Sequence, residues 1–264
     1  MADEEALRAL RLEADRTHAY GSHPEQVVDV LLPRGGGDGS EGRTLVVLFH
    51  GGFWRPRWDR HHTAPLAEAL AAEGYLVAVP EYRRTPGWPE IFDDVAVCME
   101  TLATTVAAEG PRPSRTVYVG HSAGGHLALW AAARRRLPGG SPWHSGGRPD
   151  AVVSLAGCAS LRLCDEWNLG GGAARAMMGG GVDVLPARYA DCDPAALLPL
   201  GVPVTLIHGA DDDDVPPTMS RAYAQAARKA GDETHLVELE GVEHFGVIDP
   251  TSPAWPHLLA ALES

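Results

Sequence analysis

A serine at the centre of a short glycine-containing motif has the setting of a nucleophile. Gly120, Ser122 and Gly124 form G-x-S-x-G, placed directly between the β-branched run at 116–120 and an Ala/Leu-rich stretch with helical spacing. A strand that turns abruptly into a helix holds its apex residue in a strained conformation and needs small residues on both sides. We therefore predict that Ser122 is a nucleophile that forms an acyl-enzyme, and not part of a merely structural turn.

Two later segments offer the groups that such a serine needs. A serine hydroxyl requires a base, and the base requires a carboxylate that fixes its tautomer. Four consecutive aspartates, 211–214, follow the apolar run at 204–209, and His244 follows the run at 235–241. The carboxyl ends of parallel strands meet at one edge of a sheet, so these groups should lie on the same edge as Ser122.

The elements that position these residues alternate along the chain. Short runs rich in Val and Leu predict strands at 27–33, 44–51, 75–82, 116–120, 151–157, 204–209 and 235–241. Ala-rich stretches predict helices at 63–74, 91–110, 126–136 and 220–231, and an opening helix carries Leu7, Leu10 and Ala14 on one side. This alternation indicates an α/β fold, a mainly parallel sheet with helices on both faces. The length predicts a single domain over 1–264.

Three segments fall outside the alternation. The glycine-rich stretches at 35–39 and 139–147 lack the context of a phosphate-binding loop and are interpreted as surface loops. The irregular stretch at about 161–185 follows a predicted strand directly. It is either a small lid over the carboxyl ends of the strands or a surface excursion.

The balance of charged residues excludes several kinds of partner. The 264 residues carry 22 Lys and Arg against 35 Asp and Glu, a formal net charge of −13. Nucleic acids and anionic membranes are held by cationic side chains, so we expect neither as a partner. The charged amino-terminal stretch does not resemble a signal peptide, and no apolar run reaches the ~20 residues that span a membrane. We expect a cytoplasmic protein that acts on a small molecule.

Cysteine and histidine usage points away from metal and disulfide chemistry. His61 and His62, with Asp59 and His50, form the strongest metal-ligand pattern, but adjacent histidines on one helix diverge and no H-E-x-x-H is present. We therefore expect neither a metal nor another cofactor. The cysteines form no C-x-x-C pair, are interpreted as small buried side chains and suit a reducing compartment. They are Cys98, Cys158, Cys164 and Cys192.

The chain resembles the α/β-hydrolase family from about Val27 onwards. The matching motifs are HGGFW at 50–54, GHSAGGHLA at 120–128, HGADDDDVP at 208–216 and EHFGVIDP at 243–250. The resemblance implies a triad of Ser122, Asp212 and His244. Asp213 is the alternative acid, because the aspartate run permits a slip of one residue.

The same resemblance implies an oxyanion hole. Backbone N–H groups in the HGGFW loop can point at the oxygen that becomes negative in a tetrahedral intermediate, and the resemblance assigns these donors to Gly52 and Phe53. The residue after the nucleophile, Ala123, supplies a further N–H at a helix start, where the dipole favours an anion. The HGGFW form looks most like the kynurenine formamidase and small-carboxylesterase branch.

These features predict a serine hydrolase that cleaves a small ester or amide, with a short acyl or formyl group on an aromatic leaving group. Trp54 is the tryptophan favoured as a substrate-binding wall, with a place in the core as the alternative. An acyltransferase or cyclising thioesterase would use the same triad, and a non-catalytic hydrolase-fold binding protein is a further alternative. The sequence does not define the oligomeric state.

Overall fold

The computed structural model describes residues 4–34, 43–107 and 113–264. Its sheet has eight strands in the order β1-β2-β4-β3-β5-β6-β7-β8. The strands are β1 Arg16–Ala19, β2 Val27–Leu31, β3 Thr44–Phe49, β4 Leu76–Pro80, β5 Arg115–His121, β6 Ala151–Leu155, β7 Val204–Gly209 and β8 Thr234–Leu239. Strands β3 to β8 pair in parallel, whereas β1 pairs with β2, and β2 with β4, in antiparallel.

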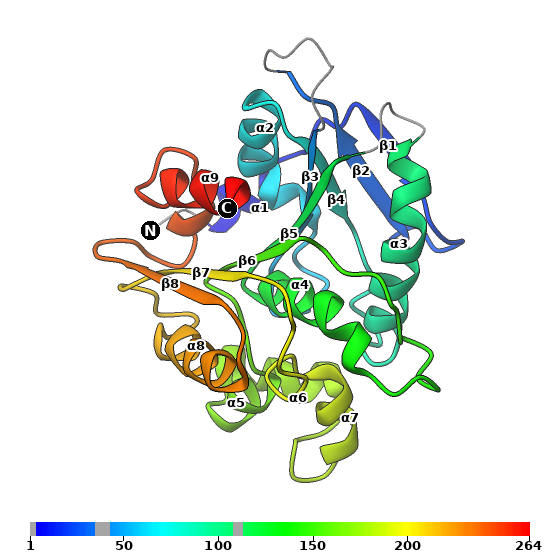
Figure 1. The fold of residues 1–264 in the computed structure, drawn as a ribbon, viewed down its shortest axis with the longest axis vertical. Coiled ribbons are helices and arrows are strands. Elements are labelled where there is room, and N and C mark those ends of the chain that lie inside the picture. The colour runs from blue at the N-terminus through cyan, green and yellow to red at the C-terminus, as the bar shows by residue number, and fades with distance from the viewer. Residues whose placement is uncertain (1–3, 35–42, 108–112) are drawn as a thin grey trace.

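Helices cover both faces of this sheet (Figure 1). They are α1 Glu4–Ala9, α2 Ala64–Ala72, α3 Glu90–Ala107, α4 Ala123–Ala133, α5 Leu161–Glu166, α6 Leu169–Met178, α7 Pro186–Cys192, α8 Thr218–Ala230 and α9 Ala254–Glu263. Short 3-10 helices occupy Arg60–Thr63, Arg134–Arg136 and Gly246–Ile248. The α/β prediction and the mainly parallel sheet are confirmed.

The continuous apolar runs follow from burial on both faces. Along β3, Leu45, Val47 and Phe49 join a core with α3, α4 and α8, while Val46 and Leu48 join a second core with α2 and α9. Successive side chains of a strand point to opposite faces, so a strand covered on both sides needs apolar residues at every position. The result is a rigid central strand that ends at the HGGFW loop.

The predicted elements differ from the structure mainly at their ends. All seven predicted strands are present, but the antiparallel edge strand β1 was not predicted. The opening helix ends at Ala9, before Ala14. Segment 139–147 is an irregular loop as expected, whereas the loop predicted at 35–39 and the last residues of the helix predicted at 91–110 lie outside the described residues.

The stretch at 161–185 is mostly helical and is organised around the buried carboxylate of Asp165. It comprises α5 and α6, with α7 immediately after it. Asp165 accepts hydrogen bonds from Arg175 and from the amide of Val182, at 2.8 and 2.9 Å. Helix α6 starts with a left-handed turn at Gly170, Gly171 and Gly172, which all have positive φ. Only glycine adopts such a run at little cost.

Candidate active site

Ser122 lies at a strained turn between β5 and α4. Its φ and ψ are 55° and −120°, a conformation that costs a non-glycine residue free energy and persists only where the surroundings impose it. The flanking glycines explain the motif, because a Cβ at Gly120 would lie 2.1 Å from the carbonyl oxygen of Gly124. A Cβ at Gly124 would lie 2.1 Å from the carbonyl oxygen of Phe49. No other residue type fits at these two positions without moving the backbone.

Asp212 and His244 form a buried acid–histidine pair at the ends of β7 and β8. Nδ1 of His244 is 2.7 Å from Oδ2 of Asp212. Oδ1 of Asp212 accepts the amide N–H groups of Asp214 and Val215, at 2.9 and 2.8 Å. The other three aspartates of the run are exposed. The structure thus joins Asp212, and not Asp213, to His244.

A second histidine shares the same carboxylate oxygen, and sequence reasoning missed it. Nε2 of His208 is 3.1 Å from Oδ2 of Asp212 and 2.8 Å from the carbonyl oxygen of Val215. Nδ1 of His208 is 2.7 Å from Oγ of Ser220, and the two acceptor oxygens at Nε2 require a proton on that nitrogen. Burial raises the pKa of Asp212. Hydrogen bonds from His208 and His244 outweigh this effect and hold the pKa well below its ordinary value. The spacing of His208 and Asp212, four residues apart at a strand end, was the available signal.

The loop that carries His244 packs against the serine turn. Nε2 of His121, the residue before Ser122, is 3.1 Å from the carbonyl oxygen of His244, and the two rings lie 4.7 Å apart. The Ser122 hydroxyl itself makes no hydrogen bond to any residue in the described part of the chain. Bonds between a nucleophile and its base are often long without substrate and tighten in the reacting complex.

The HGGFW loop approaches the serine closely through its glycines. A Cβ at Gly51 would lie 3.0 Å from Cβ of Ser122, so a larger residue there would displace the nucleophile. Gly52, Phe53 and Trp54 follow with φ of 112°, 49° and 55°, an unusual succession that turns the backbone sharply. The amide N–H groups of Gly52, Phe53 and Ala123 have no hydrogen-bond partner among the residues described. These are the donors that the sequence predicted for an oxyanion hole.

The aromatic residues of this loop have different surroundings. Trp54 is 2% exposed, and its indole N–H donates to Nδ1 of His126 at 3.2 Å. This placement favours the core interpretation of Trp54 over a substrate wall. Phe53 is partly buried under the left-handed turn, where a Cβ at Gly170 would lie 2.9 Å from the Phe53 ring. Arg55 also donates to the carbonyl oxygen of Gly170, so segment 161–185 contacts the HGGFW loop.

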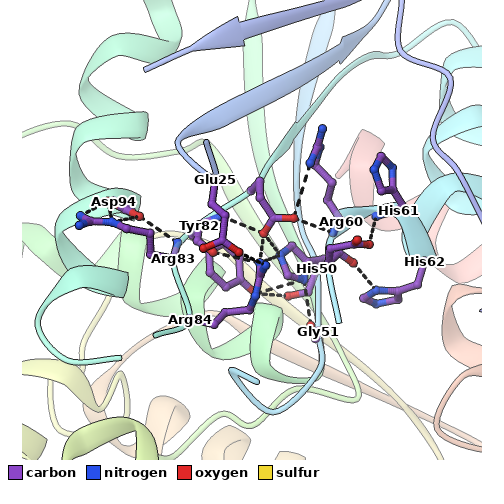
Figure 2. A network of polar contacts seen from close by, with 12 residues as sticks. Glu25, His50, Gly51, Arg60, His61, His62, Tyr82, Arg83, Arg84 and Asp94 are labelled. Atoms are coloured by element: carbon purple, nitrogen blue, oxygen red, sulfur yellow. Dashed lines mark hydrogen bonds and ion pairs between the residues drawn. The ribbon is translucent and has the colours of Figure 1, made fainter. Parts of the chain in front are cut away.

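A buried polar network lies behind the loop (Figure 2). His50 is fully buried between Glu81, at 2.8 Å from its Nε2, and the carbonyl oxygen of Gly51, at 2.9 Å from its Nδ1. Its ring stacks on Tyr82 with 4.3 Å between centroids, and the Tyr82 hydroxyl donates to the backbone oxygen of His50 at 2.6 Å. Arg84 completes the contact by donating to Glu81. The sequence pattern placed His50 in the HGGFW motif and beside the candidate metal ligands, but it did not reveal this network.

The candidate metal ligands point to different partners. Nδ1 of His61 accepts the amide N–H of Leu12 at 3.1 Å, and Nδ1 of His62 donates to the carbonyl oxygen of Asp59 at 2.6 Å. Burial is the main cause that lowers the pKa of His62, to about 3. Among the described residues, no group of three His, Cys, Asp or Glu side chains is placed to hold a metal ion.

The sheet, the serine turn and the adjoining acid–histidine pair define an α/β-hydrolase. Comparison with family models places residues 28–226 in the family described as BD-FAE, and because this match covers more than half of the chain, the protein belongs to that family of α/β-hydrolase-type esterases. The kynurenine formamidase branch suggested by HGGFW stays a prediction.

Curated relatives are named as esterases. A protein from Oryza sativa subsp. japonica, named probable isoprenylcysteine alpha-carbonyl methylesterase, is 28% identical over 251 residues, covering 88% of this chain and 58% of that protein. Esterase LipQ of Mycobacterium tuberculosis is 28% identical over 223 residues, covering 78% of this chain and 52% of that protein. The chain therefore spans little more than half the length of these relatives.

Solved structures share the fold. A truncated carbohydrate esterase from gut microbiota has a TM-score of 0.78 at 18% identity, with 96% of this chain and 98% of that one covered. Esterase B from Lactobacillus rhamnosis has a TM-score of 0.78 at 19% identity, with 98% and 89% covered. Identities this low establish the architecture alone. Within the described ranges, no helix is both long enough and apolar enough to cross a membrane.

Proposed function

We propose that this protein is a serine esterase that hydrolyses a small carboxylic ester through Ser122, Asp212 and His244. The single observation that carries the proposal is the position of Ser122 at a strained turn whose neighbours are an acid–histidine pair and three unpartnered amides. Names of the relatives support a carboxylic ester as the substrate class.

In the proposed mechanism, each step is defined by the group that holds the transferred proton. His244 Nε2 takes the proton of Ser122 as Oγ attacks the acyl carbon, and Asp212 stabilises the imidazolium that forms. The amides of Gly52, Phe53 and Ala123 donate to the new oxyanion. Collapse of this intermediate breaks the ester bond, and His244 returns the proton to the leaving oxygen. Water then attacks the acyl-enzyme with His244 as the base, and the free carboxylic acid leaves Ser122.

The surroundings of Phe53 support a short acyl group. Phe53 lies next to the amides assigned to the oxyanion hole and is pressed under Gly170 of the left-handed turn, which leaves little room to lengthen the acyl chain on that side. We infer that acetyl, formyl or a similarly short group on an aromatic leaving group is the best substrate, and that the HGGFW motif supports the formamidase-like option. Segment 161–185 acts as the lid over this side of the site.

A hydrolysis screen tests the proposal. The panel contains N-formyl arylamines, aryl esters from acetyl to octanoyl, acetylated sugars and methyl esters, assayed with the parent protein, Ser122→Ala and the loop control Ser145→Ala. We expect turnover of at least one ester class by the parent and Ser145→Ala and none by Ser122→Ala. Activity that persists in Ser122→Ala contradicts the proposal. Turnover that appears only with an added alcohol or amine favours an acyltransferase, and binding without turnover favours a hydrolase-fold binding protein.

A further inference from the structure

His50, the first residue of the HGGFW loop, has an oxygen acceptor at each ring nitrogen (Figure 2). Nε2 is 2.8 Å from Oε1 of Glu81, and Nδ1 is 2.9 Å from the carbonyl oxygen of Gly51. A ring nitrogen without hydrogen would turn its lone pair toward the lone pairs of that oxygen. Both contacts therefore require an N–H, and only the imidazolium form of His50 supplies two.

The surroundings of Glu81 support its ionised form. Glu81 accepts the amide N–H groups of Arg60 and Tyr82, at 3.1 and 3.0 Å, and the guanidinium of Arg84. Although burial raises the pKa of Glu81, attraction to His50 and Arg84 lowers it to a net value well below the ordinary one. A protonated Glu81 would lose these charge-assisted bonds. A carboxylate is thus available to pair with the His50 ring.

Three other groups face the His50 ring. Nη1 of Arg84 is 3.4 Å from Nε2 of His50, but it donates its hydrogen bond to Oε1 of Glu81. That oxygen lies closer to Nε2 than Nη1 does. The Tyr82 hydroxyl is 3.4 Å from Nδ1 and donates instead to the backbone oxygen of His50, at 2.6 Å. The His62 ring is 5.8 Å away, and burial keeps it neutral. None of these contacts supplies an N–H or O–H that replaces a ring proton.

The Gly51 carbonyl connects His50 to the reaction. This carbonyl and the amide N–H of Gly52 belong to one peptide unit, and Gly52 is one of the assigned oxyanion donors. A hydrogen bond to the carbonyl polarises the peptide and strengthens its N–H as a donor. We propose that Glu81 holds His50 as an imidazolium whose Nδ1–H orients and polarises the Gly51–Gly52 peptide. The inference rests on the proposed function, and both residues are positioning residues that do not touch substrate.

Two substitutions separate the two ring contacts of His50. The amide nitrogen of Asn reaches the place of Nδ1, and that of Gln reaches the place of Nε2. His50→Gln therefore loses the Gly51 contact, and we expect kcat to fall by about 10- to 100-fold, short of the about 10²–10³-fold cost of deleting an oxyanion donor. KM should stay within about threefold, because the donor acts on the transition state. His50→Asn should lose less. Equal losses in kcat and in ester binding would indicate a merely structural role.

Glu81→Gln tests the same pair from the carboxylate side. Without the carboxylate charge the second ring proton is no longer stabilised, and a neutral His50 that keeps only its Nδ1–H polarises the Gly51 carbonyl less. We expect kcat to fall by less than in His50→Gln, with KM within about threefold. Glu25→Gln is the matched control, because Glu25 touches Arg84 and not His50, and it should keep the kcat of the parent.

Nitrogen NMR of the ¹⁵N-histidine-labelled parent measures the proton state directly, and His50→Asn identifies the His50 signals. We expect two protonated-type nitrogens at pH 8 with couplings to hydrogen on both. A neutral tautomer of the parent at pH 8, or a Glu81→Gln variant that keeps both ring protons at pH 8, overturns the inference. Labelling of Ser122 by a fluorophosphonate tests the proposed function separately, because it does not depend on the charge of His50.

Discussion

Replacing Asp212 by Asn is a small change with a large expected consequence. In the structure, Oδ1 of Asp212 accepts two backbone amides, at 2.9 and 2.8 Å. An Asn side chain must place its only carbonyl oxygen there, because its NH₂ group cannot accept. The NH₂ group then takes the position of Oδ2, which is 2.7 Å from Nδ1 of His244.

This orientation traps His244 in the wrong tautomer. A donor opposite Nδ1 requires that nitrogen to accept, so the proton moves to Nε2, the atom that must take the proton of Ser122. We expect kcat to fall by about 10³–10⁴-fold, equivalent to about 4–5.5 kcal/mol of transition-state stabilisation. The loss includes the charge that stabilises the imidazolium. Asp212→Ala, although less conservative, leaves both tautomers accessible and should cost no more than Asp212→Asn.

Pre-steady-state release of nitrophenol from a nitrophenyl acetate measures the acylation step, and circular dichroism verifies that each variant folds. Asp213→Asn is the matched control, since Asp213 is exposed and adjoins the same run, and it should retain acylation within about twofold. A large loss in Asp213→Asn with little in Asp212→Asn would refute the assignment. An Asp212→Ala variant much slower than Asp212→Asn would refute the tautomer argument.

Three further results are expected. Burial lowers the pKa of His62 to about 3 and that of His126 to about 4, and it also lowers the pKa of His121. These rings stay neutral in the folded protein, whereas the unfolded chain binds protons below about pH 6.5, so the free energy of unfolding from urea titrations should be about 3–4 kcal/mol lower at pH 5.5 than at pH 7. Equal free energies at the two pH values would contradict this. Trp54→Ala should lower the free energy of unfolding by about 3–5 kcal/mol in the same titration at pH 7, because it leaves a cavity at a buried, hydrogen-bonded site. An unchanged urea midpoint would instead favour Trp54 as a substrate-binding wall. For aryl esters, kcat/KM should fall steeply beyond about four acyl carbons, at about 1–3 kcal/mol for each methylene that is not accommodated, and Phe53→Ala should relax that limit. Equal turnover of octanoyl and acetyl esters by the parent would contradict a site that admits only short acyl groups.

The central strands and the serine turn were predictable because local sequence determines them. An apolar run buried on both faces is readable without knowledge of its neighbours, and G-x-S-x-G between a strand and a helix has a steric cause that the contacts of Gly120 and Gly124 display. The order of Ser122, the aspartate run and His244 was readable for the same reason. The choice of Asp212 within the run required the resemblance, because four identical side chains carry no local distinction.

Other features depend on contacts that no local pattern reveals. Strand β1, with the sequence RTHA, is a mostly exposed edge strand without apolar alternation, and pairing with β2 is what forms it. The His50 network joins residues more than 30 positions apart, from Glu25 to Glu81. His208 looked like part of a strand end until its distance to Asp212 was known. Long-range polar contacts of this kind are set by the fold and not by spacing.

The most direct test of the central claim is the identity of the residue that becomes covalently modified. Treatment with a fluorophosphonate, followed by peptide mass spectrometry, should place a single label on Ser122, and Ser122→Ala should remain unlabelled and inactive while unfolding at the same temperature as the parent. Label on a different serine, or esterase activity that survives in Ser122→Ala, would contradict the assignment of this chain as a serine esterase acting through the turn at the end of β5.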